Sequence, residues 1–128
     1  MSTQALFTFR DANSSFKVYK HHDGYPEGAV LAINNALPHA WPLPRFEADE
    51  FAAAFVAGNK GGGGGVYLMP SDPWRKVISC DIEFRYEVTL KDDRLHTRCW
   101  GIYCDDVGGI TRFTQSPILR DGNVRFDR

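Results

Sequence analysis

The chain has 128 residues, and its 15 lysines and arginines against 16 aspartates and glutamates leave a formal net charge of -1. That balance excludes a general electrostatic attraction to duplex DNA or to an anionic membrane, so neither is an expected partner. Hydrophobic residues make up 43% of the chain and charged residues 24%, which excludes a disordered protein and predicts one folded domain over residues 1–128.

Two strands are expected near the N-terminus. Phe7 and Phe9 alternate with more polar neighbours over residues 5–10, and the alternation resumes over residues 16–20. The residues between them, 11–15, are mostly Asp, Asn and Ser, which favour turns. The pattern predicts a β-hairpin.

A helix is expected after this hairpin. Pro26 suits the first position of a helix because its missing N–H would have no partner there. Val30, Ile33 and Leu37 then keep the spacing of one buried stripe. Pro38 cannot continue a helix without losing a hydrogen bond, so the helix is expected to end there.

A stiff connector and a second helix are expected next. Three prolines between residues 38 and 44 favour an extended chain with Trp41 as an anchor. Carboxylates stabilise the first turn of a helix, and those that follow the connector are Glu47, Asp49 and Glu50. The apolar face of the second helix is predicted to hold Phe51, Ala54, Phe55 and Gly58. The glycine-rich residues 59–65 are predicted to form a flexible loop.

The C-terminal half is predicted to consist of strands. Residues 80–91 alternate without interruption, which is typical of a strand with one buried and one wet face. The positions expected to face the core together are Cys80, Ile82, Phe84, Tyr86, Val88 and Leu90. Residues 95–103 are expected to pair with this strand, and a last strand is expected near 110–114. The whole order predicts an α+β fold, an antiparallel sheet of about five strands with two helices packed on one face.

The sequence lacks the patterns that would indicate secretion, membrane insertion, disulfide bonds or catalysis. Its three cysteines are odd in number and lack the Cys-x-x-Cys spacing, which favours reduced thiols over disulfides or a zinc site. The chain carries no signal-peptide pattern and no run near the roughly 20 apolar residues of a membrane span. None of its candidate nucleophiles lies in a recognisable motif. We therefore expect a cytoplasmic, non-enzymatic protein without a metal or cofactor, and the sequence leaves a homo-oligomer open.

The densest local cluster of functional side chains is the segment from Tyr19 to Gly28, with the pattern Tyr-x-His-x-Asp-Gly-Tyr-Pro-x-Gly. A period of two would place Tyr19, His21 and Asp23 on one face at the end of a strand. His beside Asp could form a metal site or a proton-transfer pair, and a small metal-dependent or nucleotide hydrolase centred on His21, His22 and Asp23 is the alternative function. Asp-Gly and Tyr-Pro are also ordinary turn and helix-entry sequences, so a purely structural role stays open.

The same pattern, followed by a short helix and the acidic segment 46–51, resembles a family of small, mostly uncharacterised proteins encoded by bacteriophages and prophages. The resemblance covers about residues 16–60 and brings no established catalytic residue with it. It implies a binding antagonist of a bacterial defence system, either masking a protein complex, as anti-CRISPR proteins do, or sequestering a nucleotide signal. The corresponding compartment is the cytoplasm of the bacterial host.

The two versions of this function predict different contact residues. Masking a host defence protein complex would use exposed aromatic and acidic residues, here Trp41, Glu47, Asp49 and Glu50. Sequestering a nucleotide signalling molecule would use stacking rings and guanidinium groups, here Tyr19, His21, Tyr25, Arg98 and Trp100. The C-terminal arginines also fit a solvated sheet face on which they pair with nearby acids.

Overall fold

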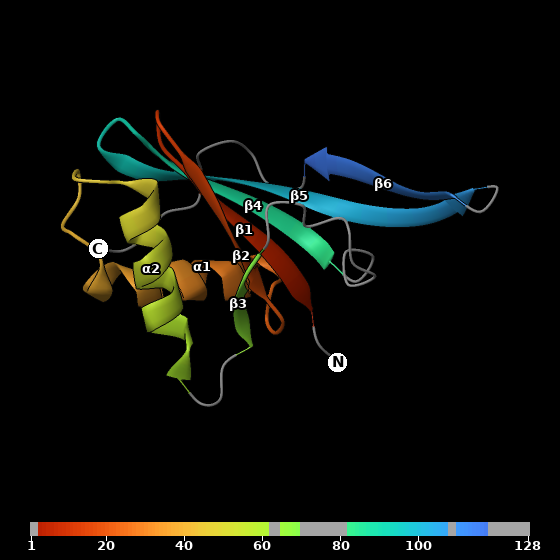
Figure 1. Ribbon diagram of the computed structural model, residues 1–128, viewed down its shortest axis with the longest axis horizontal. Coiled ribbons are helices and arrows are strands. Elements are labelled where there is room, and N and C mark those ends of the chain that lie inside the picture. Colours follow the sequence, from red (N-terminus) through yellow and green to blue (C-terminus); the bar gives the residue numbers. More distant parts are fainter. Residues whose placement is uncertain (1–2, 62–64, 70–81, 108–109, 118–128) are drawn as a thin grey trace.

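The computed structural model describes residues 3–61, 65–69, 82–107 and 110–117 (Figure 1). In chain order its elements are β1 (Gln4–Arg10), β2 (Ser15–Lys20), α1 (Pro26–Ala36), a 3-10 turn η1 (Leu37–His39), α2 (Ala48–Asn59), β3 (Val66–Leu68), β4 (Ile82–Lys91), β5 (Arg94–Val107) and β6 (Ile110–Pro117). The predicted hairpin, the two helices and the strand near residues 110–114 are all present.

The fold is α+β, as predicted, but the sheet is mixed rather than purely antiparallel. Its strand order is β3-β2-β1-β4-β5-β6. β1 pairs with β4 in parallel, whereas the other neighbours are antiparallel. Parallel neighbours need a long crossover connection, and β2, both helices and β3 supply it here. The prediction of about five strands omitted β3, which is too short to show an alternating pattern.

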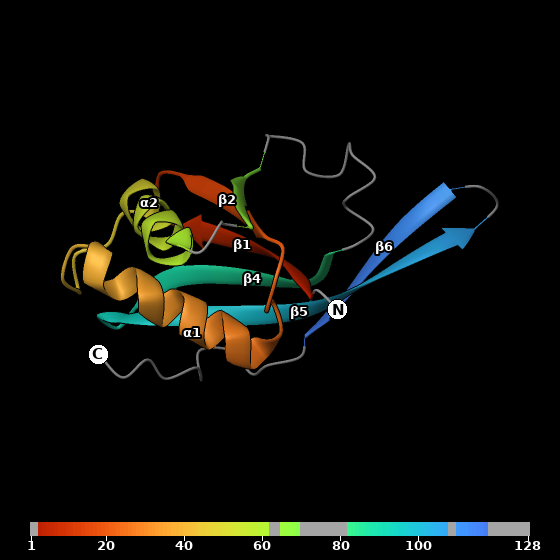
Figure 2. The ribbon, with the colours of Figure 1, turned by 90° about the horizontal axis from the view of Figure 1, so that it is seen from below.

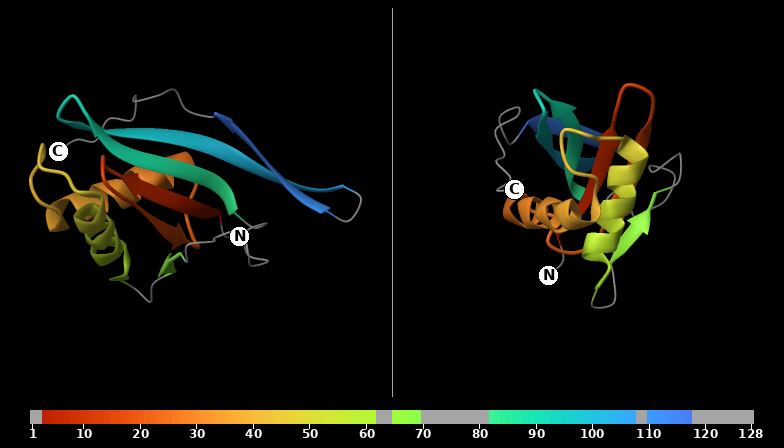
Figure 3. Two further views of the ribbon diagram at one scale, coloured as in Figure 1. Left: turned by 45° about the horizontal axis from the view of Figure 1, so that its top comes forward. Right: turned by 90° about the vertical axis from the view of Figure 1, so that its left-hand side faces the viewer.

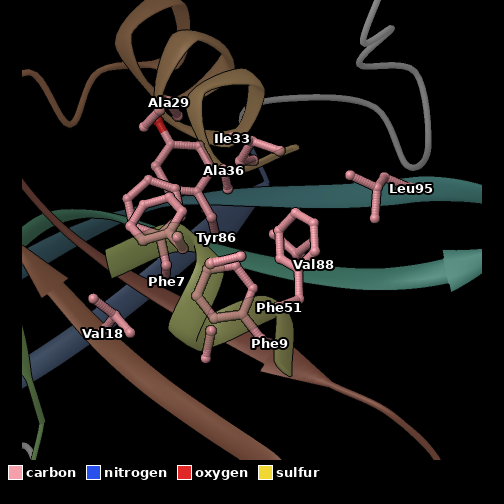
Figure 4. Close-up of a cluster of buried hydrophobic side chains, with 14 of the residues drawn as sticks. Phe7, Phe9, Val18, Ala29, Ile33, Ala36, Phe51, Tyr86, Val88 and Leu95 are labelled. Atoms are coloured by element: carbon pink, nitrogen blue, oxygen red, sulfur yellow. The ribbon is translucent and has the colours of Figure 1, made fainter. Parts of the chain in front are cut away.

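Both helices lie on the same face of the sheet, as predicted (Figures 2 and 3). The core between them and the sheet is aromatic (Figure 4). The ring of Phe55 on α2 lies 4.7 Å from Phe7 and 5.1 Å from Phe9, and Phe7 stacks on Tyr86 of β4 at 4.8 Å. Phe7 and Phe9 thus face the core together, and α2 covers them.

The opposite face of the sheet has a second, smaller core. Leu6, Tyr19 and Ile82 are buried together there, with Met69 packed against them. β1 is therefore buried on both faces. Leu6 and Thr8, which alternate with Phe7 and Phe9, are buried as well because β1 is an interior strand.

The predicted common face of residues 80–90 is also interrupted. Ile82 lies on the opposite face from Phe84, Tyr86 and Val88, because the pairing of β1 with β4 shifts register between Gln4 and Ala5. One extra residue in a strand moves its neighbour to the other face of the sheet. Cys80 lies outside the described residues.

The buried stripe of α1 differs from the prediction. The helix buries Ala29, Ala32, Ile33 and Ala36, whereas Val30 is only partly buried and Leu37 belongs to η1. Small residues on this face let α1 and α2 approach closely. A Cβ on Gly58 of α2 would overlap the carbonyl oxygen of Asn35, so Gly58 lies where the two helices meet.

Both predicted connecting segments carry more fixed structure than expected. Pro38 lies in the 3-10 turn η1 instead of an extended chain.

The predicted flexible loop 59–65 begins inside a helix. Asn59 still belongs to α2, and its side-chain amide donates to the carbonyl oxygens of Phe55 and Ala32 at 2.8 and 2.9 Å. Gly65, at the other end of the glycine-rich segment, accepts a hydrogen bond from the backbone of His21 at 2.7 Å. Residues 62–64 lie outside the described part of the chain.

Candidate functional site

Tyr19 and His21 are brought together as the sequence predicts. The Tyr19 hydroxyl lies 2.7 Å from His21 Nδ1, and the ring of His22 meets that of His21 edge-on at a centroid distance of 4.6 Å. Tyr19 itself is only 2% exposed and packs against Tyr67 of β3 at 5.9 Å. This aromatic contact joins the end of β2 to the edge strand β3.

Asp23 lies in the segment between β2 and α1. It has a φ of 56°, in the left-handed region, and its side chain is exposed in the turn before α1. Across the described ranges, His, Cys, Asp and Glu side chains form no group of three or more that could hold a metal ion.

The Asp-Gly-Tyr-Pro-x-Gly segment instead fixes the start of α1 on the sheet. The N–H of Gly24 donates to the carbonyl of Thr3 at 2.8 Å, and the buried hydroxyl of Tyr86 donates to the carbonyl of Gly24 at 2.7 Å. A Cβ on Gly24 would lie 2.6 Å from that of Ala5, and one on Gly28 would overlap the carbonyl oxygen of Asp23. Both glycines are needed because the backbones approach so closely.

Tyr25 precedes α1 in this segment. It occupies the N-cap position, and its carbonyl accepts a hydrogen bond from the N–H of Ala29 at 2.8 Å. Its ring is 39% exposed. Tyr25 therefore begins the helix and belongs to neither the Tyr19–His21 contact nor the Arg98–Trp100 contact described below.

The acidic residues of α2 have separate roles. Both carboxylate oxygens of Glu50 accept from the N–H of Trp41, at 3.2 and 3.3 Å, and the guanidinium of Arg45 lies 3.6 Å above the Trp41 ring. Trp41 and Glu50 therefore hold the connector against α2. Glu47 is exposed at the N-cap position of α2, and Asp49 is exposed in the first turn of this helix.

A groove runs along the edge of the sheet between the β2–β3 pair and α2. It encloses about 430 Å³ and is lined by Ser15, Phe16, Lys17, Asp49, Ala52, Ala53, Leu68 and Met69. We call this surface the edge groove. Phe16 is 43% exposed and Leu68 is 76% exposed, although both are large and apolar. Sequence reasoning named Asp49 but missed Phe16 and Leu68. Phe16 alternates with polar residues along its strand, and Leu68 lies in the apolar stretch 66–69, and both patterns predict burial.

The remaining predicted residues, Arg98 and Trp100, meet on the face of the sheet opposite the helices. The Trp100 ring lies 4.8 Å from the Arg98 guanidinium and 4.5 Å from that of Arg85, its neighbour across β4 and β5. Tyr19 lies in the same cross-strand row as Trp100, but Leu6 and Arg85 separate them, a span of about 14 Å at the usual strand spacing. The five residues predicted to hold a nucleotide thus do not form one pocket.

Cys99 packs into the core as a free, buried thiol. Burial raises its pKa to about 11, so the reactive thiolate is suppressed at neutral pH. A buried, protonated thiol of this kind packs as a small hydrophobic residue. The side chains of the other two cysteines lie outside the described part.

Comparisons of the chain with protein-family models, with curated proteins and with solved structures find no match. Helices within the described ranges are all too short or too polar to cross a membrane.

Proposed function

We propose that this protein acts by binding rather than by catalysis, and that the edge groove is where it docks a protein component of a bacterial defence system. The observation that carries the proposal is the exposure of Phe16 and Leu68 beside this groove. Large apolar side chains gathered in one exposed place usually mark a protein interaction site.

The position of the groove favours an extended segment as the occupant. β3 is the edge strand of the sheet, and its middle residue Tyr67 pairs directly with Tyr19 of β2. Alternate residues of a strand direct their backbone groups to opposite sides, so Val66 and Leu68 direct theirs outward. A strand added beside β3 could pair with those groups while its apolar side chains enter the groove.

The polar residues of the groove are consistent with such a partner. Lys17 and Asp49 carry opposite charges, and the rest of the lining is apolar or uncharged. A bound segment would therefore need apolar side chains in the middle and could place either charge at its ends. Protein interfaces commonly have this arrangement, an apolar centre inside a polar rim.

The proposal is tested by whether the protein protects phage from immunity. Strains that each carry one defence system would express the wild-type protein, and phage plating on them would be counted. We expect the wild type to restore plating in at least one strain, and Leu68→Glu to abolish that effect because it places a charge in the groove.

Leu31→Glu is the matched control. Leu31 is 64% exposed on α1, so this change alters the same residue type at a similar exposure but away from the groove. We expect it to retain activity. If the wild type restores plating in none of the strains, or if both variants act alike, the proposal is wrong.

A further inference from the structure

Lys60, the exposed C-cap residue of α2, lies at the outer edge of β3. Its ammonium donates to the carbonyl oxygen of Val66 at 3.3 Å and lies 5.5 Å from the centre of the Tyr67 ring. The N–H of Met69 donates inward to Lys17 on β2. Because backbone groups alternate in direction along a strand, those of Val66 point outward. Lys60 therefore binds the same carbonyl that a docking strand would use.

A docking strand would take the Val66 carbonyl away from the Lys60 ammonium. A hydrogen bond from a charged donor is stronger than one between neutral groups, so its loss costs free energy unless another acceptor replaces it. Residues that face each other across two strands place their side chains on the same face of the sheet. Val66 packs into the core on the face that α2 covers, and Lys60 extends from the end of α2. The docked residue facing Val66 would thus direct its side chain toward Lys60.

Leu68 sets a second requirement on the docked segment. It lies two residues from Val66, so its side chain is on the same face of the sheet, and it is 76% exposed beside the edge groove. The docked residue that faces Leu68 would need an apolar side chain to cover it. Lys17 and Asp49 line the groove with opposite charges, so this part of it favours neither sign.

Lys20 is the other lysine near Val66. It is the cross-strand neighbour of Val66 on β2, and its ammonium donates to the carbonyl of His22. Burial lowers the pKa of Lys20, and the charge of Asp23 opposes this. Because β2 lies one strand further from the outer edge, Lys60 is the lysine closer to a docked strand.

We propose that the segment docked in the edge groove carries an acidic residue facing Val66 and an apolar residue, two positions away, facing Leu68. The acidic carboxylate would replace the Val66 carbonyl as the acceptor for the Lys60 ammonium. Side chains alternate along a strand, so the two residues share one face whichever way the segment runs. The inference rests on the proposed docking function of the groove and names the chemistry of the segment that it takes.

Selection of random linear peptides displayed on phage tests the inference without knowledge of the natural partner. The bait is the immobilised full chain, and peptides that also bind Leu68→Glu are removed because this variant places a charge in the groove. We expect the wild type to enrich peptides with an acidic residue two positions from an apolar one. Replacing that acidic residue by its amide should weaken binding by about threefold, as loss of an exposed ion pair does.

Lys60→Glu should change the selected pattern. We expect it to enrich a basic residue where the wild type selects an acidic one. Lys91→Glu is the matched control, since Lys91 is also exposed but lies on β4, which β1 separates from β2. It should select the wild-type pattern. Lys60→Gln should lose the acidic preference, and it places no carboxylate at the C-terminal end of α2, so it tests the inference even if Lys60→Glu fails to fold.

Three results would overturn the inference. The wild type could enrich peptides without an acidic preference, or enrich none over Leu68→Glu. Lys60→Gln could select the same acidic residue as the wild type. The plating test decides the docking function separately: restored plating with selected peptides that lack the acidic residue overturns the inference alone. The expected peptides without restored plating would overturn the defence function and retain the inferred segment.

Discussion

Asp11 lies in the turn between β1 and β2, yet its carboxylate also reaches the N-terminus of α2. One carboxylate oxygen accepts from the N–H groups of Asn13 and Ser14, both at 2.8 Å, and the other accepts from the N–H of Ala48 at 2.7 Å. The bond from Ala48 is the largest of the effects that lower the Asp11 pKa. A residue from the hairpin thus supplies the cap that α2 lacks locally.

The lowered pKa of Asp11 predicts a pH-dependent contribution to stability. A carboxyl whose pKa is lower in the folded state stabilises the fold above its unfolded pKa, near 4, and loses that contribution as the pH falls through its folded value. Asp11→Asn should therefore reduce the free energy of unfolding at pH 7, and the difference from wild type should shrink as the pH falls below about 4. Urea denaturation across this range measures both. A difference independent of pH would contradict the capping role.

The glycines of the Asp-Gly-Tyr-Pro-x-Gly segment give a second residue-scale prediction. Gly24→Ala and Gly28→Ala should each cost about 1–3 kcal/mol of stability, because the new methyl group must displace packed backbone. Gly61→Ala is the control, since no heavy atom lies within 4 Å of its added Cβ. Thermal unfolding of the three variants makes the comparison. Equal stability for all of them would show that this segment is not a close-packed junction.

Sequence reasoning identified these residues without settling their role. Asp11 was predicted only as a turn former because its second partner, Ala48, is 37 positions away. The unusual density of the segment from Tyr19 to Gly28 was correctly noticed, and its Tyr19–His21 contact is local enough to predict. Whether Gly24 and Gly28 have a chemical or a packing role depends on where β1 and β4 lie relative to them. The residues near these glycines in the sequence do not predict that arrangement.

At the scale of elements, the crossing of α1 and α2 depends on small residues. Gly58 lies against Asn35, and the Asn59 side chain bonds the carbonyl of Ala32 across the two helices. The start of α1 at Pro26, and its end at Ala36 shortly before Pro38, are close to what proline chemistry predicts. The face that α1 buries did not, because close contact with α2 favours its alanines over its larger residues.

Gly58→Ala tests this crossing, because the change in stability that we expect has the opposite sign to the change that helix propensity alone predicts. Alanine in place of glycine should stabilise an isolated helix by about 1 kcal/mol. We expect the protein to be destabilised instead, because the new methyl group would overlap the Asn35 carbonyl and push the helices apart. Chemical denaturation gives the free energy of unfolding. An increase in that value would mean that the helices do not meet closely at Gly58.

At the scale of the whole molecule, sequence patterns predicted the α+β class but not the strand order. Alternation reports which residues of a strand are buried, whereas the partner of each strand depends on long-range packing. The parallel pairing of β1 with β4 makes both interior and leaves β3 at one edge beside α2. The edge groove is a product of that order, which is why Leu68 could not be predicted as a surface residue.

Site-specific photocrosslinking tests the central claim most directly, that this protein functions through the edge groove. A photoreactive amino acid would replace Leu68 or, as the control, Leu31, in cells with a defence system against which the wild-type protein restores phage plating. The account predicts that position 68 crosslinks to a component of that system and position 31 does not. Excess unlabelled wild-type protein should suppress the crosslink, and excess Leu68→Glu should not. Equal crosslinking from both positions, or none from position 68, would contradict the account.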